Sequence, residues 1–230
     1  MRSIMKKVFY TEIAYLLGII ELALGAAFMV KADFGMSMVV APAYLIYRKL
    51  SEVYAFVTFG MAEYITQAFL LCLLVVVLRK FKVYYLFSFI TAVYYGFMLD
   101  IWMRVTENLD ASSIGIRIFY FVLGVALCAN GVAFIFRTYI APEVYELFVK
   151  EVSGKMNIPI TRFKTGYDCV SCLISILLSF LFYGFMHFVG VNIGTVICAL
   201  TFGWTIGVFG KVLDKYWQFT DALPLRKYFE

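Results

Sequence analysis

The sequence has few charged residues. Asp, Glu, Lys and Arg make up 15% of it, against about 25% in an ordinary soluble domain. Hydrophobic residues make up 63%, and the mean hydropathy is +0.88. A water-soluble fold of 230 residues could not bury that much apolar surface. We therefore predict an integral membrane protein whose apolar surface faces lipid.

Motifs of familiar enzymes are also lacking. The sequence has no Walker-type phosphate loop, no HExxH, no Gly-x-Ser-x-Gly and no EF-hand loop. Its single histidine, His187, cannot make a zinc site alone, because such sites use several ligands. We expect it to pack at the membrane interface. The sequence thus predicts no enzymatic activity, no cofactor and no metal site.

Neither nucleic-acid binding nor a disulfide framework is indicated. The net charge is +5, but the basic residues lie at the ends of apolar runs and form no stripe. The five cysteines all lie inside apolar runs, which is typical of small core residues. Cys169 and Cys172 have CxxC spacing, which we interpret as small residues at a helix interface.

Six segments are long and apolar enough to cross a bilayer, which takes about 20 residues. They are 10–30, 56–78, 83–103, 115–136, 166–188 and 191–212. The basic start leads into an apolar run that continues past Glu21, so we predict a first helix that is retained and not a cleaved signal peptide. Two shorter stretches, Met38–Tyr47 and Pro142–Val152, are predicted to be interfacial or re-entrant helices.

The basic residues predict the orientation, because cytoplasmic loops are enriched in Lys and Arg. With the N-terminus in the cytoplasm, 15 of the 20 lie inside and 5 outside. The five on the outer side are Lys31, Arg48, Lys49, Arg104 and Arg117. We therefore predict a multi-pass protein of the cell membrane with both termini in the cytoplasm.

The two halves of the chain resemble each other at an offset of about 106 residues. Residues 27–31 match 133–137, residues 60–64 align with 165–169, and residues 92–97 match 199–204. We predict two three-helix repeats in one membrane domain, residues 1–110 and 111–230. Because each repeat has an odd number of spans, the second enters the membrane inverted. Inverted repeats with short segments at matching places are typical of transporters.

Several segments carry a family resemblance over nearly the whole chain. They are Lys31-Ala32-Asp33-Phe34-Gly35, Phe163-Lys164-Thr165 leading to Asp168, and the run from Val191 to Leu200. On these the chain resembles the YczE/YitT-like bacterial membrane proteins. The resemblance implies a protein of the bacterial cytoplasmic membrane, and it implies no particular activity.

Glu21 is the ionisable residue placed deepest in a predicted span. It lies about ten residues from either end of the first helix, too deep for its side chain to reach the interface. An unpaired charge there costs about 2.5–3.5 kcal/mol or more. One interpretation is a carboxylate that binds a cation, a proton or a polar solute. The other is a protonated side chain that hydrogen-bonds two helices together.

Other polar residues fall at matching places of the two repeats. Glu63 aligns with Asp168, and Lys31 aligns with Arg137. These four either form ion pairs at helix ends or serve as gates on the two sides of the membrane. Further candidates are the amides Asn130 and Asn192, which bridge helices or contact a solute, and Asp100, whose spacing favours an i,i+4 pair with Arg104.

The function that these features favour is transport. We predict a small-solute permease or exporter with a cavity between the repeats and Glu21 as its central polar group. Glu63, Asp168, Asn130 and Asn192 are the other candidate substrate contacts. One alternative is an accessory subunit that docks a protein partner through segment 138–165, using Glu143 and Glu146. Another is an enzyme acting on a lipid-linked substrate.

Overall fold

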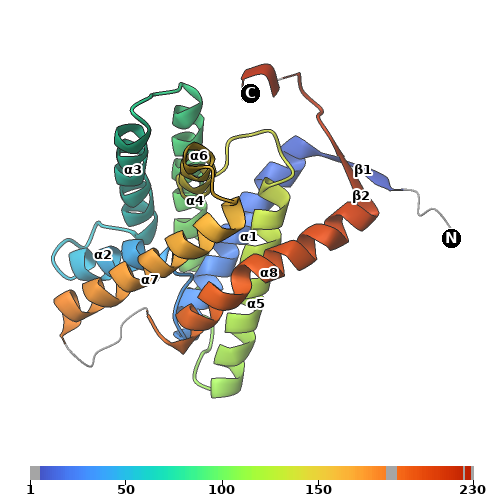
Figure 1. Cartoon of the computed structure of the whole chain (residues 1–230). Coiled ribbons are helices and arrows are strands. Elements are labelled where there is room, and N and C mark those ends of the chain that lie inside the picture. Colours follow the sequence, from blue (N-terminus) through green and yellow to red (C-terminus); the bar gives the residue numbers. More distant parts are fainter. Residues whose placement is uncertain (1–5, 185–190, 225, 229–230) are drawn as a thin grey trace.

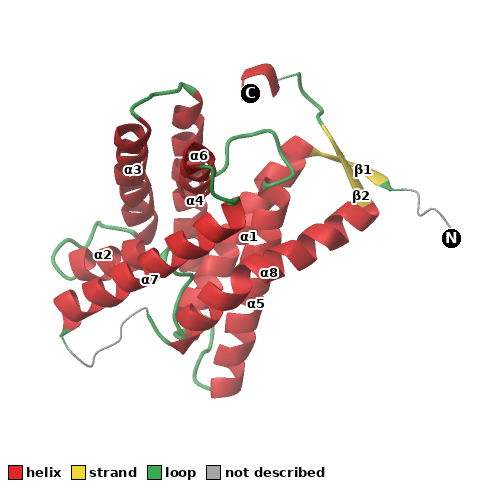
Figure 2. Cartoon of the chain, in the orientation of Figure 1, coloured by secondary structure: helices red, strands yellow, loops and turns green. Residues whose placement is uncertain are grey.

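The computed structural model describes residues 6–184, 191–224 and 226–228. Within this part the chain forms eight α-helices and almost no sheet, so the all-α membrane fold is confirmed (Figures 1 and 2). Six helices are long and apolar enough to cross a membrane, which identifies a multi-pass membrane protein. They are α1 (Thr11–Ala32), α3 (Phe59–Leu78), α4 (Tyr84–Glu107), α5 (Ile114–Ile135), α7 (Ile160–Tyr183) and α8 (Ile193–Tyr216). His187 lies outside the described residues.

Two short helices separate the long ones. They are α2 (Ala41–Ser51) and α6 (Val144–Met156), at the places where the sequence predicts short helices. Both have an Ala-Pro pair near their start. Ala41-Pro42 are the first two residues of α2, and Ala141-Pro142 come shortly before α6. Proline suits the start of a helix because its missing N–H is one that has no partner in the helix anyway. In the bundle α2 packs against α3 and α7, and α6 packs against α3, α4 and α7.

The centre of the bundle is the antiparallel pair of α1 and α5. Gly18 lies against Gly131, and Gly25 lies against Gly124. A Cβ on Gly25 would stand 2.6 Å from the carbonyl oxygen of Gly124, so only glycine permits this approach. Small residues at helix contacts are the usual means of close packing in membranes. Helix α4 packs on α1, and α8 packs on α5.

The long helices present large apolar side chains outward. Phe69, Leu181 and Leu200 are each more than 70% exposed, and they come from three different spans. Such exposure would be unfavourable in water but matches a hydrocarbon environment. Of the five cysteines, which are all free, Cys128 and Cys198 are buried as expected of core residues. Cys72 and Cys169 are exposed, so the core interpretation is wrong for them.

Two short strands tie the ends of the helical bundle together. Strand β1 (Lys7–Tyr10) pairs in parallel with β2 (Trp217–Thr220), joining the start of α1 to the end of α8 (Figure 1). Behind the strands, the Glu12 carboxylate accepts from the backbone N–H groups of Ala222 and Leu223 at 2.9–3.2 Å. The sequence prediction did not include these strands. We call β1, β2 and the Glu12 contacts the terminal clamp.

Candidate functional site

The start of α6 brings Glu143 next to Glu63 of α3 inside the bundle, and we call these two carboxyl groups the acidic cluster. Glu143 precedes the first turn of α6, and only 4% of its surface is exposed. The chain before it is held by Thr91 of α4, whose hydroxyl donates to the carbonyl of Ala141 at 2.9 Å. The α6 turn that follows carries Tyr145 and Glu146 toward the same region. Segment 138–165 is therefore packed inside the protein at this point.

Helix α3 supplies two side chains, one turn apart, that bind the start of α6. Gln67 donates to the Glu143 carboxylate at 3.3 Å and accepts from the backbone N–H of Val144 at 3.1 Å. Glu63 accepts from the hydroxyl of Tyr145 at 3.0 Å. Glu63 and Gln67 are both fully buried. This interlocking fixes the position of two carboxyl groups away from bulk solvent.

Three buried polar atoms in and beside the acidic cluster make no hydrogen bond with the described residues. One oxygen of Glu63, one oxygen of Glu143 and the hydroxyl of Tyr95 are buried without a hydrogen-bond partner among the residues the structure describes. Leaving a buried polar group unpaired costs roughly 1–3 kcal/mol, and more when it is charged. Burial raises the pKa of Glu143 well above its ordinary value, and the nearby Glu146 and Glu63 raise it further.

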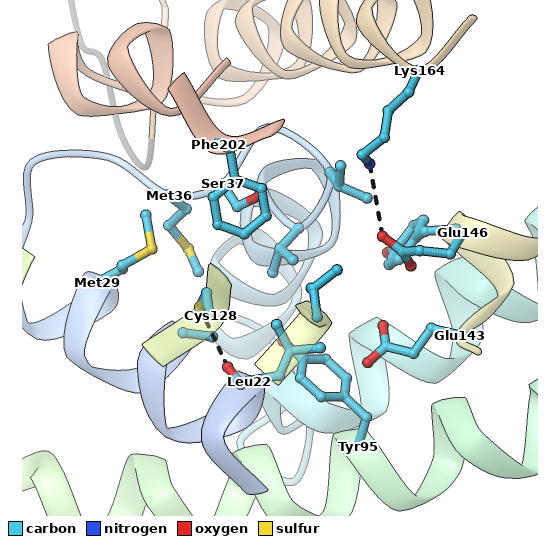
Figure 3. Close-up of a pocket in the computed structure, with 15 residues that line it drawn as sticks. Leu22, Met29, Met36, Ser37, Tyr95, Cys128, Glu143, Glu146, Lys164 and Phe202 are labelled. Carbon is cyan, nitrogen blue, oxygen red and sulfur yellow. Dashed lines mark hydrogen bonds and ion pairs between the residues drawn. The ribbon is translucent and has the colours of Figure 1, made fainter. Parts of the chain in front are cut away.

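A small cavity of about 40 Å³ adjoins this cluster. Its apolar wall comes from α1, α5, α8 and the segment leading into α2, and its polar wall from Tyr95, Glu143, Tyr145 and Glu146. Figure 3 shows Glu143 between Tyr95 and Glu146, with its carboxylate directed from α6 toward the cavity. Since a single water needs about 10–15 Å³, this inner cavity has room for a few water molecules or a small ion.

An ion-pair cluster closes the inner cavity on one side. Lys164 of α7 lies 3.7 Å from a carboxylate oxygen of Glu146 and 3.6 Å from one of Asp168 (Figure 3 shows the Glu146 contact). The side chains of Lys164, Glu146 and Asp168 are only 10–18% exposed. Ion pairs shielded from water in this way are stronger than those at a surface.

Beyond the ion-pair cluster lies a much larger cavity, the vestibule, of about 870 Å³. Glu146 and Lys164 line both this vestibule and the inner cavity. Its walls come from α6, α7, α8 and the segment after α5, and it lies on the side of the molecule that holds the terminal clamp. Burial, with a hydrogen bond to Glu12, raises the pKa of Tyr139 in its wall to about 12.

Two of the predicted site residues lie in this region. Glu63 belongs to the acidic cluster, and Asp168 belongs to the ion-pair cluster and lines the vestibule. Their matching positions in the two repeats predict a shared role. In the structure Glu63 contacts Tyr145 of α6, and Asp168 lies on α7. The ion-pair partner of Asp168 is Lys164 on its own helix.

The structure places the other candidates away from both cavities. Glu21 accepts from the side-chain amide of Asn130 at 2.6 Å, which is the helix-bridging contact of its second interpretation. Asn192 precedes α8, and its amide donates to the carbonyl of Asp33. Neither Glu21 nor these amides line the inner cavity or the vestibule.

The candidate gate cations have other partners than Glu63 and Asp168. Lys31 donates to the carbonyl of Glu107 at 2.7 Å, and Arg137 pairs with both carboxylate oxygens of Asp214 at 2.6 Å. The expected pair of Asp100 with Arg104 is replaced by a cap on α3. Both oxygens of Asp100 are used, accepting from Thr58 and from the backbone N–H of Gly60.

Sequence reasoning missed Glu143 as a site residue. It considered Glu143 and Glu146 only in the alternative of a cytoplasmic docking surface, whereas in the structure Glu143 is buried and Glu146 pairs with Lys164. The signal that could have identified them is the matching position of the two short segments, because such segments line transporter sites. Gln67 and Tyr145 gave no signal, since an amide and a phenol in apolar runs are common.

Comparison with known proteins gives one family. Residues 9–211 match DUF6198, a family of unknown function. The chain belongs to this family. The match spans most of the chain, from the end of β1 to the last turns of α8, so the matched region of this chain includes both short helices and the acidic cluster. No curated protein matches the chain. No solved structure matches it either.

Proposed function

We propose that this DUF6198 protein is a small-solute transporter, not an enzyme, that works by alternating access. In this proposal the solute or a coupling ion occupies the inner cavity and reaches one side of the membrane through the vestibule. The resemblance to YczE/YitT-like proteins and the excess of basic residues on the clamp side belong to the same proposal. They support a location in the bacterial cytoplasmic membrane with both termini inside, in which case the vestibule faces the cytoplasm.

The observation that carries the proposal is a difference between two pairs of glycines. Gly60 of α3 and Gly96 of α4 are in direct backbone contact, and Asp100 binds the start of α3 beside them. Gly203 follows Gly96 by 107 residues, as in the alignment of 92–97 with 199–204, and Gly166 follows Gly60 by 106, one position beyond the residue that the alignment of 60–64 with 165–169 pairs with Gly60. Neither Gly166 nor Gly203 has a neighbouring atom within 4 Å of where a Cβ would lie. The vestibule lies between their helices, α7 and α8.

Contacts across the centre support two inverted copies of one unit. At an offset of 106, Gly18 corresponds to Gly124 and Gly25 to Gly131. The observed contacts, Gly18 with Gly131 and Gly25 with Gly124, are those that a twofold axis between α1 and α5 would produce. The short helices obey the same relation, because α6 packs on α3 and α2 packs on α7.

Alternating access follows from an exchange of these two arrangements. One helix pair, α3–α4, is closed at its glycines, and its counterpart, α7–α8, is open. In the opposite state Gly166 and Gly203 come together while Gly60 and Gly96 separate. Transporters built from inverted repeats alternate by such exchanges around a central site. A subunit that only docks a partner has no need of two equivalent arrangements.

The experiment is to block the closure of α7 on α8. Gly203→Leu fits the open state, because nothing lies near Gly203, but its side chain would prevent contact with Gly166. Gly207→Leu is the matched control, since Gly207 is one turn further on, is equally uncrowded and does not line the vestibule. Proteoliposomes loaded with amino acids, sugars, amines and monovalent ions would show which solute the parent moves. We expect Gly203→Leu to abolish that movement and Gly207→Leu to preserve it.

A second readout needs no solute. Spin labels on α7 and α8 at Arg162 and Lys211, and on α3 and α4 at Ile65 and Ile101, report the two separations in a background without native cysteines. The proposal predicts two populations in which one separation shortens as the other lengthens, and only the open α7–α8 form in Gly203→Leu. A single population in the parent in both detergent and lipid, together with no solute movement, contradicts transport.

A further inference from the structure

We propose that the inner cavity is a binding site for a small monovalent cation, held by the free oxygen of Glu143 and the hydroxyl of Tyr95. The carboxyl group of Glu63, which accepts from the hydroxyl of Tyr145, adds negative charge nearby. In naming this cation as the transported or coupling species, the inference rests on the proposed transport function. The binding site itself is testable separately.

The first argument is charge balance. Four carboxyl groups meet around the start of α6, those of Glu63, Glu143, Glu146 and Asp168. In the part of the chain that the structure describes, the cation paired with members of this group is Lys164. It lies on the vestibule side and contacts Glu146 and Asp168, so no Lys or Arg of the described chain pairs with Glu63 or Glu143. The region therefore lacks positive charge where it is most deeply buried.

The second argument is the set of unpaired oxygens. Glu143 and Tyr95 line the inner cavity, are at most 4% exposed, and each keeps one polar atom without a partner among the described residues. Figure 3 shows the two side chains on the same side of the cavity. A bound cation would supply the missing interaction to both, and hydroxyl, carboxylate and water oxygens are the ligands that hard cations prefer.

The third argument concerns size and charge of the occupant. A cavity of about 40 Å³ has room for Na⁺, K⁺ or NH₄⁺ with one or two waters, but not for an amino acid or a sugar. Among the described residues no three His, Cys, Asp or Glu side chains are placed so that they could hold one metal ion, and dedicated divalent and transition-metal sites use such groups. One carboxylate with neutral oxygens suits a singly charged ion.

The cation competes with a proton on Glu143. Burial and the neighbouring carboxyls raise the pKa of Glu143, so in the absence of a cation the proton is held to higher pH. The ionisable groups that face it are Tyr15 on α1, Glu63 on α3, Tyr95 on α4, Cys128 on α5, and Tyr145 and Glu146 on α6. The ionisable groups of α7, Lys164, Tyr167 and Asp168, lie next to Glu146. The positive end of α6 favours the ionised form of Glu143 once a cation is present.

The test is thermal unfolding of the purified protein in chloride salts of equal ionic strength. The salts are NaCl, KCl, NH₄Cl and N-methyl-D-glucamine chloride, whose cation is too large for the cavity. At pH 8 we expect one of the small cations to raise Tm by a saturable amount, roughly 5–10 °C at high occupancy. The half-saturating concentration should increase as the pH falls, because protons compete for Glu143.

The variants locate the site. Glu143→Gln keeps an oxygen that accepts from Gln67 but has no charge, and it should lose the cation-specific shift. Glu143→Asp keeps the charge on a shorter side chain and should weaken binding at least tenfold, which keeps the test valid if the glutamine variant folds poorly. Glu52→Gln is the control, because Glu52 is an exposed acid paired with Lys49. It should respond to salts as the parent does.

Two results overturn the cation site. One is an equal Tm for the parent in all four salts from pH 6 to pH 9. The other is a cation-specific shift that persists in Glu143→Gln. Failure of transport has a different signature, because Gly203→Leu leaves the inner cavity intact and should show the full cation shift. If the parent shows the cation shift and moves no solute, the cation site stands and the transport function fails.

Discussion

Gln67 shows how one side chain can organise a buried acidic site. Its amide uses both ends, donating to the Glu143 carboxylate and accepting from the Val144 N–H. Helix starts leave N–H groups without partners, and the side chain of a distant residue here satisfies one of them. As a result α6 begins inside the protein and not at its surface. The position of Glu143, and with it the chemistry of the cavity, follows from this contact between α3 and α6.

The raised pKa of Glu143 predicts a pH dependence of stability at the scale of this single residue. Above the unfolded-state value of 4.5, the unfolded chain loses the proton while the folded chain keeps it. The folded state then binds more protons, so the free energy of unfolding decreases as pH rises, until the folded-state pKa is passed. The stabilisation by this group is complete below pH 4.5.

The measurement is unfolding of the parent and Glu143→Gln at several pH values in N-methyl-D-glucamine chloride, where no small cation is present. The stability of the parent relative to the variant should decline from pH 4.5 upward. Equal slopes for the two proteins would show that Glu143 titrates normally. The variant Glu52→Gln, which removes an exposed acid, is the control and should keep the pH dependence of the parent.

At this scale the sequence is a partial guide. Glu63 and Asp168 could be predicted because charged residues in apolar runs are rare and stand out. Glu143 could not be separated from its neighbours Lys150 and Glu151, which are typical of a cytoplasmic loop. What distinguishes it is burial against α3, a contact between residues 76 positions apart. No local periodicity reports such a contact.

At the scale of elements, the two helix pairs α3–α4 and α7–α8 are alike in sequence position but differ in packing. The first closes on Gly60 and Gly96, and the second leaves Gly166 and Gly203 apart. A glycine in a helix costs about 1 kcal/mol relative to alanine unless close packing requires it. The close backbone contact between Gly60 and Gly96 explains why both are glycine. In the observed arrangement no close packing requires glycine at 166 or 203.

This difference predicts opposite effects of the same substitution. Gly96→Ala places a Cβ 2.8 Å from the carbonyl oxygen of Gly60 and should destabilise the fold by roughly 1–3 kcal/mol through overpacking. Gly203→Ala meets open space and should be neutral or stabilising by up to about 1 kcal/mol. Thermal unfolding of the two variants in the same detergent compares them. Equal destabilisation would show that α7–α8 is as tightly packed as α3–α4.

Elements themselves were largely predictable. The six spans and two short helices follow from apolar runs and their lengths, and most bounds agree within a few residues. The exception is α7, which begins at Ile160 although the apolar run predicts a start at 166, because the charged residues Arg162 and Lys164 interrupt the apolar pattern in its first two turns. That turn is stabilised by pairing of Lys164 with Glu146 on another helix. The four-residue strands were missed because each lies at the polar end of a long helix.

At the scale of the whole molecule, the terminal clamp constrains how the bundle can move. It ties α8 to α1, and α1 is locked to α5 through two glycine contacts. The clamped end of α8 is therefore fixed to the part of the bundle that has the closest packing. In the proposed transport cycle, the vestibule would therefore close by movement of α7 and of the distal part of α8, with the clamp as the fixed point.

Removing the clamp tests this constraint. A chain ending at Tyr216 loses β2 and the acceptor role of Glu12 toward Ala222 and Leu223. We expect a broader distribution of distances between spin labels at Thr11 and Lys215, and a lower Tm, because two backbone N–H contacts to a carboxylate and a strand pairing are lost. Glu12→Gln, which weakens the contacts but keeps the strands, should fall between the parent and the truncated chain. If the truncated chain keeps a narrow distribution, packing of α8 on α5 alone holds that end, and α8 is free to pivot elsewhere along its length.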